Sequence, residues 1–126
     1  MEFHLRGDSP IYLQLVHTIS DAVVRGELKP GDRLPSQRDV AAKARVNPNT
    51  VQRAFMELER LGLTETRRGE GTYVKLDQEQ AQVLKEQAAR DAWQQFLARL
   101  AAVGYSENEV RTWVAHQMKP DGRKNV

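Results

Sequence analysis

The sequence lacks cysteine, long apolar runs and a strong net charge, and each absence excludes a class of protein. Without cysteine, the 126-residue chain forms neither a disulfide framework nor a thiolate zinc site. No apolar stretch approaches the ~18 residues that a membrane span needs, and residues 1–6 show no apolar core of a signal peptide. We therefore expect a cytoplasmic protein with a modest core and no membrane partner.

Residue patterns typical of catalysis and metal binding are also missing. No nucleophile, base and orienting residue stand in a recognisable arrangement, and no glycine-rich phosphate loop is present. The histidines, His4, His17 and His116, are widely separated and do not have the spacing of metal ligands. The sequence therefore predicts no enzyme activity, no metal site and no cofactor.

The net charge of +2 is too small to indicate a nucleic-acid partner by itself, but the charge is unevenly distributed. Residues 33–53 contain five basic side chains and one acidic side chain, whereas residues 77–126 contain seven of each. The composition, 29% charged and 40% hydrophobic, is normal for a globular domain. Positive charge is therefore concentrated in the segment 33–53.

A cap at Ser9 followed by Pro10 predicts a first helix that ends near Gly26. Its apolar face is predicted to consist of Tyr12, Leu15, Val16, Ile19, Ala22 and Val23. The next segment, residues 28–35, contains two prolines and a glycine, which favour a loop. This loop can also place a short strand against a later hairpin.

Ser36, with Asp39 three positions later, predicts the cap of a second, short helix. Its inner face is predicted to be Val40, Ala41 and Ala44. Arg45 follows in the turn, where glycine would adopt a left-handed backbone more easily, and any such strain costs of order 1 kcal/mol. A short helix and a tight turn are the first half of a helix-turn-helix.

Asn47 and Pro48 repeat the cap-plus-proline pattern and predict a third helix that runs to Leu61. Its buried stripe is predicted to be Val51, Ala54, Phe55, Leu58 and Leu61. The residues left to project outward are Asn49, Thr50, Gln52, Arg53 and Glu57. Two strand-like pieces around residues 64–74 follow, and their tip carries basic residues and glycines. Helix-turn-helix and hairpin together predict a winged helix, a fold that most often binds DNA.

The last third of the sequence predicts two more helices. Asp77 and Gln80 begin a helix that ends at Gly104, and its apolar stripe is Leu84, Ala88, Ala92, Trp93, Phe96, Leu97 and Leu100. Ser106 and Glu109 form a capping box for a final helix whose inward residues are Val110, Trp113, Val114 and Met118. Residues 120–126 are predicted to fray. The seam between residues 74 and 77 suggests a DNA-binding domain at 1–76 and a helical region at 77–126.

The outward residues of the third helix suit the major groove of DNA. Amide side chains such as those of Asn49 and Gln52 pair with adenine and the guanidinium of Arg53 pairs with guanine, although the same residues also suit an ordinary solvated helix face. Arg38, in the first turn of the second helix, suits a phosphate, or alternatively an ion pair with Asp39 or Asp32. At the hairpin tip, the predicted contacts are made by Arg67, Arg68, Gly69 and Gly71.

The C-terminal helical pair has more apolar surface than two short helices can bury by themselves. The residues predicted to meet a second copy of the chain are Leu84, Trp93, Phe96, Leu97, Leu100, Val110, Trp113 and Val114. The alternative is that they fold back on the first helix in a monomer. A symmetric pair would place two reading helices on half-sites about one helical turn, ~34 Å, apart.

Five segments in order, residues 10–15, 26–38, 46–55, 57–63 and 68–74, together resemble the GntR family of bacterial transcription regulators. The short two-helix C-terminal region resembles the YtrA subfamily, whose members are dimers and often repress neighbouring transporter operons. The resemblance implies a winged helix-turn-helix, an operator DNA partner and, in some relatives, a small-molecule effector. The rival interpretation is a winged helix that binds RNA or protein.

The resemblance also implies a set of DNA contacts. Carried over position by position, they are Arg38, Asn47, Asn49, Thr50, Gln52, Arg53, Arg67, Arg68 and Gly69, and we add their neighbours Ser36 and Gly71. Many relatives have arginine where this chain has Gln52. Their preference for guanine is therefore not carried over to this position.

Overall fold

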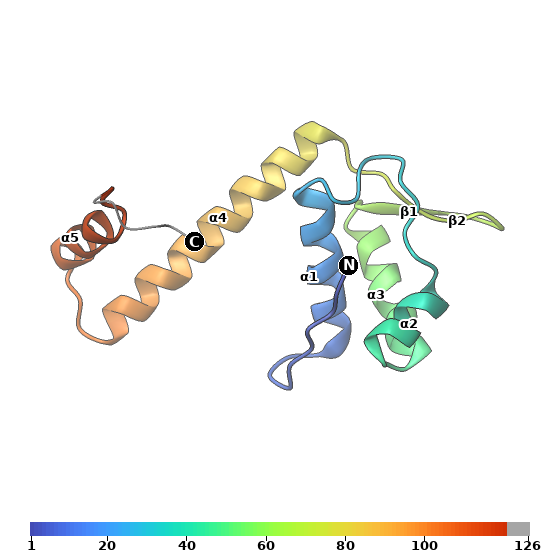
Figure 1. Cartoon of the computed structure of the whole chain (residues 1–126), viewed down its shortest axis with the longest axis horizontal. Coiled ribbons are helices and arrows are strands. Elements are labelled where there is room, and N and C mark those ends of the chain that lie inside the picture. The colour runs from blue at the N-terminus through green and yellow to red at the C-terminus, as the bar shows by residue number, and fades with distance from the viewer. Residues whose placement is uncertain (121–126) are drawn as a thin grey trace. The chain divides into compact units, whose positions relative to one another are not determined.

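The computed structural model describes residues 1–120, and the chain divides into two compact units, residues 1–85 and residues from 86 onward. The elements, labelled in Figure 1, are α1 (Ile11–Val24), α2 (Gln37–Ala44), α3 (Pro48–Arg60), β1 (Thr64–Arg67), β2 (Gly71–Val74), α4 (Gln78–Ala102) and α5 (Glu107–Gln117). The predicted fold class, mainly helical with a two-stranded wing, is confirmed. Most of the fraying predicted for 120–126 lies outside the described residues.

The core of the first unit is formed where α1 and α2 pack against α3. Leu15, Ile19, Val51 and Leu58 are completely buried there, as the helical spacing of the sequence predicts. The hairpin contributes Val74 to the same cluster. Partly buried residues from the two ends of the unit complete it, namely Met1, Phe3 and Leu5 before α1 and Ala81 and Leu84 in the first turns of α4.

The caps predicted for α2 and α3 are confirmed. The Ser36 hydroxyl accepts a hydrogen bond from the Asp39 amide at 3.0 Å, and the Asn47 side chain accepts one from the Asn49 amide at 2.7 Å. Arg45, which links the two helices, has φ 58° and ψ 50° and is the one non-glycine residue with positive φ among residues 1–120. The sequence therefore predicts the turn and its strain correctly.

The cap predicted at Ser9 is wrong. Helix α1 begins after Pro10, and no side chain caps it. The Ser9 carbonyl instead accepts a hydrogen bond from the buried Gln14 amide at 2.8 Å. That amide also exchanges two bonds of 2.7 Å with the backbone of Arg6, so Gln14 ties the N-terminal segment to α1.

The burial predicted for Leu61 is also wrong, because its side chain is 50% exposed. The chain turns at Gly62, where φ is 80°, and the Leu63 amide donates to the Leu58 carbonyl at 3.0 Å. This turn places Leu63 in the core at the position that continuous helical spacing assigns to Leu61.

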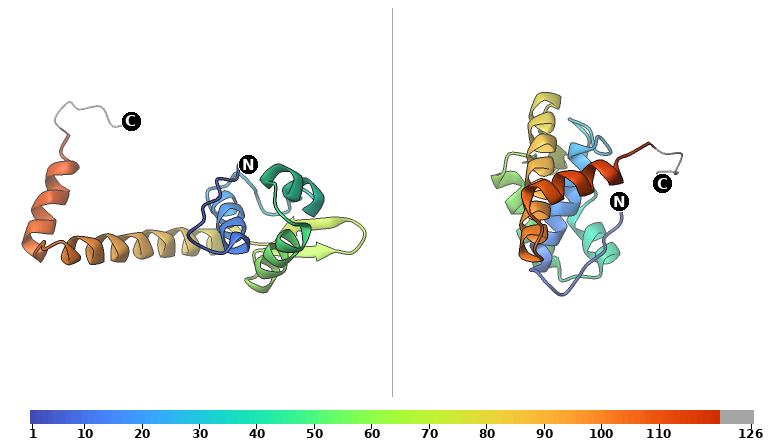
Figure 2. Two further views of the ribbon diagram at one scale, coloured as in Figure 1. Left: turned by 90° about the horizontal axis from the view of Figure 1, so that it is seen from below. Right: turned by 90° about the vertical axis from the view of Figure 1, so that its left-hand side faces the viewer.

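Strands β1 and β2 form an antiparallel hairpin with Thr64 opposite Val74 and Arg67 opposite Gly71. The loop before α2 pairs with β2 through one isolated bridge, Arg33 opposite Tyr73. The predicted short strand against the hairpin is therefore present as a single bridge. In both Figure 1 and the left view of Figure 2, the hairpin extends beyond the helices of the first unit. It thereby presents residues 68–70 as a protruding tip.

Both predicted caps of the C-terminal helices are confirmed. The Asp77 carboxylate and the Gln80 amide each bind the other residue's backbone N–H, and Ser106 and Glu109 form a full capping box at the start of α5. In the single chain, Val110 is buried, and Trp113 turns towards α4, with its ring 5.8 Å from that of Phe96, although it remains 41% exposed. Met118 is 77% exposed, so the prediction that it faces inward is wrong. Met118 follows the last residue of α5, so the helical spacing that places Val110 and Val114 does not apply to it.

Among the described helices, none combines the length and the apolar character that crossing a bilayer requires.

Candidate nucleic-acid interface

The N-terminal half of α3 presents a polar surface. Because Val51, Ala54, Phe55 and Leu58 are buried on one side, the opposite side turns Asn49, Gln52 and Arg53 to solvent, with Thr50 half-buried beside them. Pro48 supplies the preset φ of the first turn, and the Asn47 cap satisfies one of its free amides. The start of this helix is therefore well defined, and its exposed amides and guanidinium suit base edges.

Arg53 is held in place by an aromatic ring that the sequence pattern does not single out. Its guanidinium carbon lies 3.8 Å from the centroid of Tyr12 in α1. A cation–π contact of this kind orients the guanidinium against the packed pair α1 and α3. The sequence places Tyr12 only on the apolar face of α1. The one indication of its contact with Arg53 is that it is the aromatic residue of an otherwise aliphatic stripe.

A carboxylate lies further along the same helix. Arg60 donates two hydrogen bonds to Glu57, at 2.6 and 2.8 Å, and these hold the pKa of Glu57 below its ordinary value, with a smaller contribution from the charge of Arg53. The same pair raises the pKa of Arg60. Glu57 stays ionised, but Arg60 on the same helix compensates its negative charge. It therefore does not repel an approaching phosphate as strongly as a carboxylate without a partner would.

Arg38 is exposed in the first turn of α2 and makes no ion pair with any residue in 1–120. The alternative pairings with Asp39 and Asp32 are not formed, and the Asp32 carboxylate instead accepts a hydrogen bond from the Lys29 amide at 2.8 Å. An unpaired guanidinium beside the free amides of a helix start is a suitable group for a phosphate.

The hairpin combines one restrained arginine and one free arginine. Arg67 lies over Tyr73 at 4.1 Å and pairs with Glu65 at 3.3 Å, whereas Arg68 is exposed and has no ion-pair partner among the described residues. Gly69, at the tip, has φ 78° and open space around its Cα. Arg67 is therefore positioned by the strand, and Arg68 is available at the tip.

Gly71 has a structural reason to be glycine. Its φ is +126°, and a Cβ there would lie 2.6 Å from Nε of Arg33. The Arg33 side chain thus lies against the tip end of the hairpin, where Gly71 is opposite Arg67. Arg33 is a further basic residue near the predicted contacts, and the sequence pattern identifies it only as part of the charge of the segment 33–53.

The predicted contact residues of α2, α3 and the hairpin all belong to the first unit, and α2 packs directly against α3. Figure 1 shows α2 beside the N-terminal end of α3. Residues 11–74 match the family model described as bacterial regulatory proteins, gntR family. The chain belongs to the GntR family. Members of this family are transcription regulators, which agrees with the prediction that the chain is not an enzyme.

Two GntR relatives support this membership over different lengths. The chain is 41% identical to the HTH-type transcriptional regulator YhcF of Bacillus subtilis over 110 residues, which are 87% of this chain and 91% of YhcF. It is 48% identical to the HTH-type transcriptional repressor YtrA of the same organism over 69 residues, 55% of this chain and 53% of YtrA. The predicted similarity to short YtrA-type regulators is confirmed.

Two solved structures agree with the fold and with DNA binding. A GntR family transcriptional regulator from Listeria monocytogenes superposes with a TM-score of 0.79 at 34% identity, covering 89% of this chain and 98% of that protein. The AraR DNA-binding domain in complex with an operator superposes with a TM-score of 0.55 at 25% identity, covering 59% of this chain and 95% of the AraR domain. The chain is a DNA-binding transcriptional regulator of the GntR family.

Proposed function

We propose that this regulator is a homodimeric repressor that binds a near-palindromic operator of a nearby operon, with a transporter operon as the first candidate, through α3 and the hairpin. Residues 1–76 would bind DNA and residues 77–126 would form the dimerisation region. The observation that carries the proposal is the exposed polar face of α3, on which the Arg53 guanidinium is held by Tyr12. A repressor that occupies its operator acts by blocking polymerase access.

In this proposal, the contact residues divide by chemistry. Asn49 and Gln52 would pair with adenine and Arg53 with guanine, each contact contributing about 1–3 kcal/mol of discrimination. Arg38, Arg67 and Arg68 would bind phosphates, which set orientation rather than sequence. The remaining proposed contacts are Ser36, Asn47, Thr50, Gly69 and Gly71. Ser36 and Asn47 already cap helices, so their part would be to position the backbone amides.

The aromatic surface of the C-terminal unit supports dimerisation. Phe96 stacks on Trp93 at 5.6 Å and contacts Trp113 at 5.8 Å, yet both tryptophans remain more than 40% exposed. Leu97, Val110 and Val114 line an apolar hollow of about 760 Å³ beside them. A second copy covering this surface would bury apolar area at ~25 cal/mol per Å². Leu84, by contrast, packs against the core of the first unit.

Repression is supported by one relative, the transcriptional repressor YtrA, and is tested on DNA. We would select bound fragments from the native genome with the full-length protein, and then measure its affinity for the recovered duplex and for a scrambled duplex. Transcription from a promoter carrying that duplex should fall when the protein is present. Equal affinity for both duplexes, or unchanged transcription, would contradict the proposal.

Dimerisation is tested separately by light scattering. Trp113→Ser removes an exposed apolar side chain from the aromatic surface and should shift the protein towards monomer. Val103→Ser is the matched control, because Val103 is 57% exposed and makes no contact in the Trp93–Phe96–Trp113 cluster. A wild-type protein that is monomeric at all accessible concentrations would rule out the dimer.

A further inference from the structure

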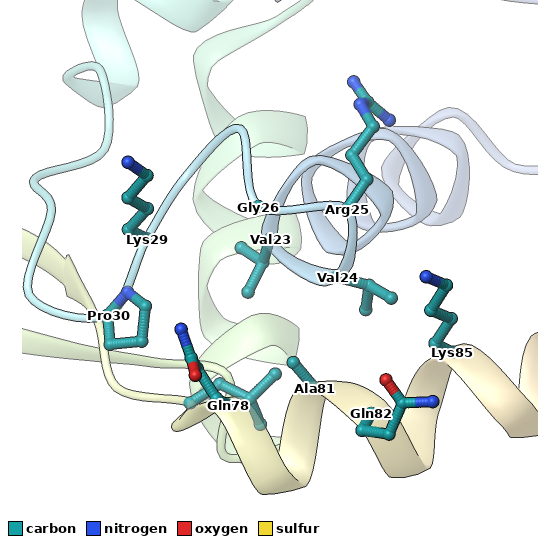
Figure 3. A pocket seen from close by; sticks show the side chains of 11 residues that line it. Val23, Val24, Arg25, Gly26, Lys29, Pro30, Gln78, Ala81, Gln82 and Lys85 are labelled. Carbon is teal, nitrogen blue, oxygen red and sulfur yellow. The ribbon is translucent and has the colours of Figure 1, made fainter.

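A cavity of about 490 Å³ lies within the first unit, at the C-terminal end of α1. The loop that follows α1 and the first turns of α4 form its other walls, as Figure 3 shows. None of the residues that line the cavity is among the predicted DNA contacts. Its volume falls in the range of about 300–1,000 Å³ typical of small-molecule sites.

The cavity is already formed without a ligand. Its loop is held at one end by the amides of Glu27 and Leu28, which donate to the Ala22 carbonyl at 2.9 and 3.1 Å, and at the other by Gly31, which donates to the Val74 carbonyl at 2.9 Å. The α4 wall is held by the Asp77 cap and by the packing of Ala81 against the core. A ligand would thus bind without ordering these segments first.

The lining combines an apolar floor with groups that donate hydrogen bonds. Val23 and Leu76 are buried at the floor. Gln78 and Gln82 face the cavity from α4, and their amides make no hydrogen bond to a described residue. An apolar floor with a few polar groups is the usual composition of a site for a small organic molecule.

The charged groups of the lining are all of one sign. Arg25, Lys29 and Lys85 line the cavity, and no carboxylate does. Arg25 is paired with Glu27 at 2.6 Å, but Lys29 and Lys85 form no ion pair with any residue in 1–120. Three acids lie close to this set: Glu27 pairs with Arg25, the Asp32 carboxylate accepts a hydrogen bond from the Lys29 amide at 2.8 Å, and Asp21 lines an adjoining hollow with Lys85. None of them forms an ion pair with the ammonium group of Lys29 or Lys85. Two ammonium groups without an ion pair around one cavity, with no carboxylate in its lining, favour an anion.

We propose that this cavity binds a small organic anion with an apolar body, whose carboxylate or phosphate is held by Lys29 and Lys85 and whose apolar part lies on Val23 and Leu76. The amides of Gln78 and Gln82 donate further hydrogen bonds. Such a ligand contacts α1, the loop and α4 at once, so it stabilises the packing of the first turns of α4 against the core. The site is a candidate for the effector of this regulator.

The test uses the full-length protein without DNA, with phenyl phosphate as the anionic probe and benzyl alcohol as its neutral counterpart. Backbone amide chemical shifts of residues 23–30 and 76–85 should move saturably with phenyl phosphate, with a Kd on the order of 1 mM as expected for a small fragment. The variant K29Q/K85Q should weaken binding at least about tenfold, corresponding to the removal of two charged partners of the anion. Lys43→Gln, on the exposed side of α2, is the matched control and should bind as the wild type does.

Unchanged shifts in these two segments would overturn the proposal, as would equal binding of benzyl alcohol or of the K29Q/K85Q variant. A third refuting result is a K29Q/K85Q protein that binds operator DNA more weakly in the absence of probe, because the two lysines would then serve DNA phosphates. Spectra of the variant outside the cavity confirm that it folds. Since no step uses repression, failure of this site and failure of the proposed function are distinguishable.

Discussion

Arg53 contacts Tyr12 and, in the proposed function, also pairs with guanine, and the substitution Arg53→Ala can separate these two roles. Its guanidinium lies 3.8 Å from the Tyr12 ring centroid, a contact that contributes about 0.5–1 kcal/mol to stability at an exposed site. A bidentate contact with guanine contributes about 1–3 kcal/mol of discrimination. The DNA effect is therefore expected to exceed the effect on folding.

The magnitude on DNA follows from these values. Removing one guanine contact weakens binding to the cognate duplex by about 5- to 150-fold, because 1.4 kcal/mol corresponds to a factor of ten. If two copies of the chain occupy two half-sites, as we propose, the substitution removes the guanine contact from each, and the lower limit becomes about 30-fold. Binding to a scrambled duplex should change much less, since only a charge is removed there.

The assay is fluorescence anisotropy with cognate and scrambled duplexes at one fixed salt concentration, accompanied by urea unfolding of each variant. Tyr12→Leu is the control, because it removes the ring beneath Arg53 and keeps an apolar side chain in α1. It should lower stability by the cation–π contribution and reduce specificity less than Arg53→Ala. Equal losses of affinity on both duplexes for Arg53→Ala, or identical effects of the two substitutions, would show that Arg53 only packs and does not read bases.

Three further substitutions address the wing, the core and pH. Arg67→Ala should weaken binding to all duplexes alike and reduce the slope of log affinity against log salt by about 0.9 for each phosphate that is no longer neutralised, measured by anisotropy at several salt concentrations. Leu58→Ala should lower the free energy of unfolding in urea by about 2–5 kcal/mol because Leu58 is fully buried, whereas Met56→Ala, at a 66% exposed position, should change it by no more than about 0.5 kcal/mol. The hydrogen bond from Arg60 lowers the folded-state pKa of Glu57, so its contribution to stability is complete above the unfolded-state pKa and disappears as pH falls through the lowered value. Glu57→Gln should therefore flatten the loss of stability seen in urea titrations on acidification; an unchanged acid limb would show that the pair contributes nothing.

Features that depend on a few neighbouring residues could be predicted from the sequence. The caps at Ser36, Asn47 and Ser106 each involve a side chain and an amide two or three positions later, and the left-handed backbone of Arg45 follows from the turn between two capped helices. The same applies to most of the buried stripe of α3, because a regular helix repeats every 3.6 residues.

The errors have a common physical cause, which is competition from groups distant in sequence or beyond the helix. Ser9 fits a cap pattern, but Gln14 occupies its carbonyl and fixes the segment differently. Leu61 fits the helical period, but the turn at Gly62 gives its place to Leu63. In the candidate site, three contacts join separate elements: Arg53 with the Tyr12 ring, Arg67 with the Tyr73 ring, and Arg33 with Gly71. No local sequence pattern predicts contacts of this kind.

The Gln14 side chain behaves like the edge of a strand: one amide group matches the backbone of Arg6 on both its donor and its acceptor. These two hydrogen bonds hold the N-terminal segment so that Phe3 and Leu5 pack against the core, although they precede the segment 11–74 by which the family is recognised. A minimal DNA-binding fragment trimmed to residues 11–74 would lose the packing of Phe3 and Leu5 against the core and would leave the Gln14 amide without its partners. A shortened form of this regulator should therefore begin ahead of residue 3.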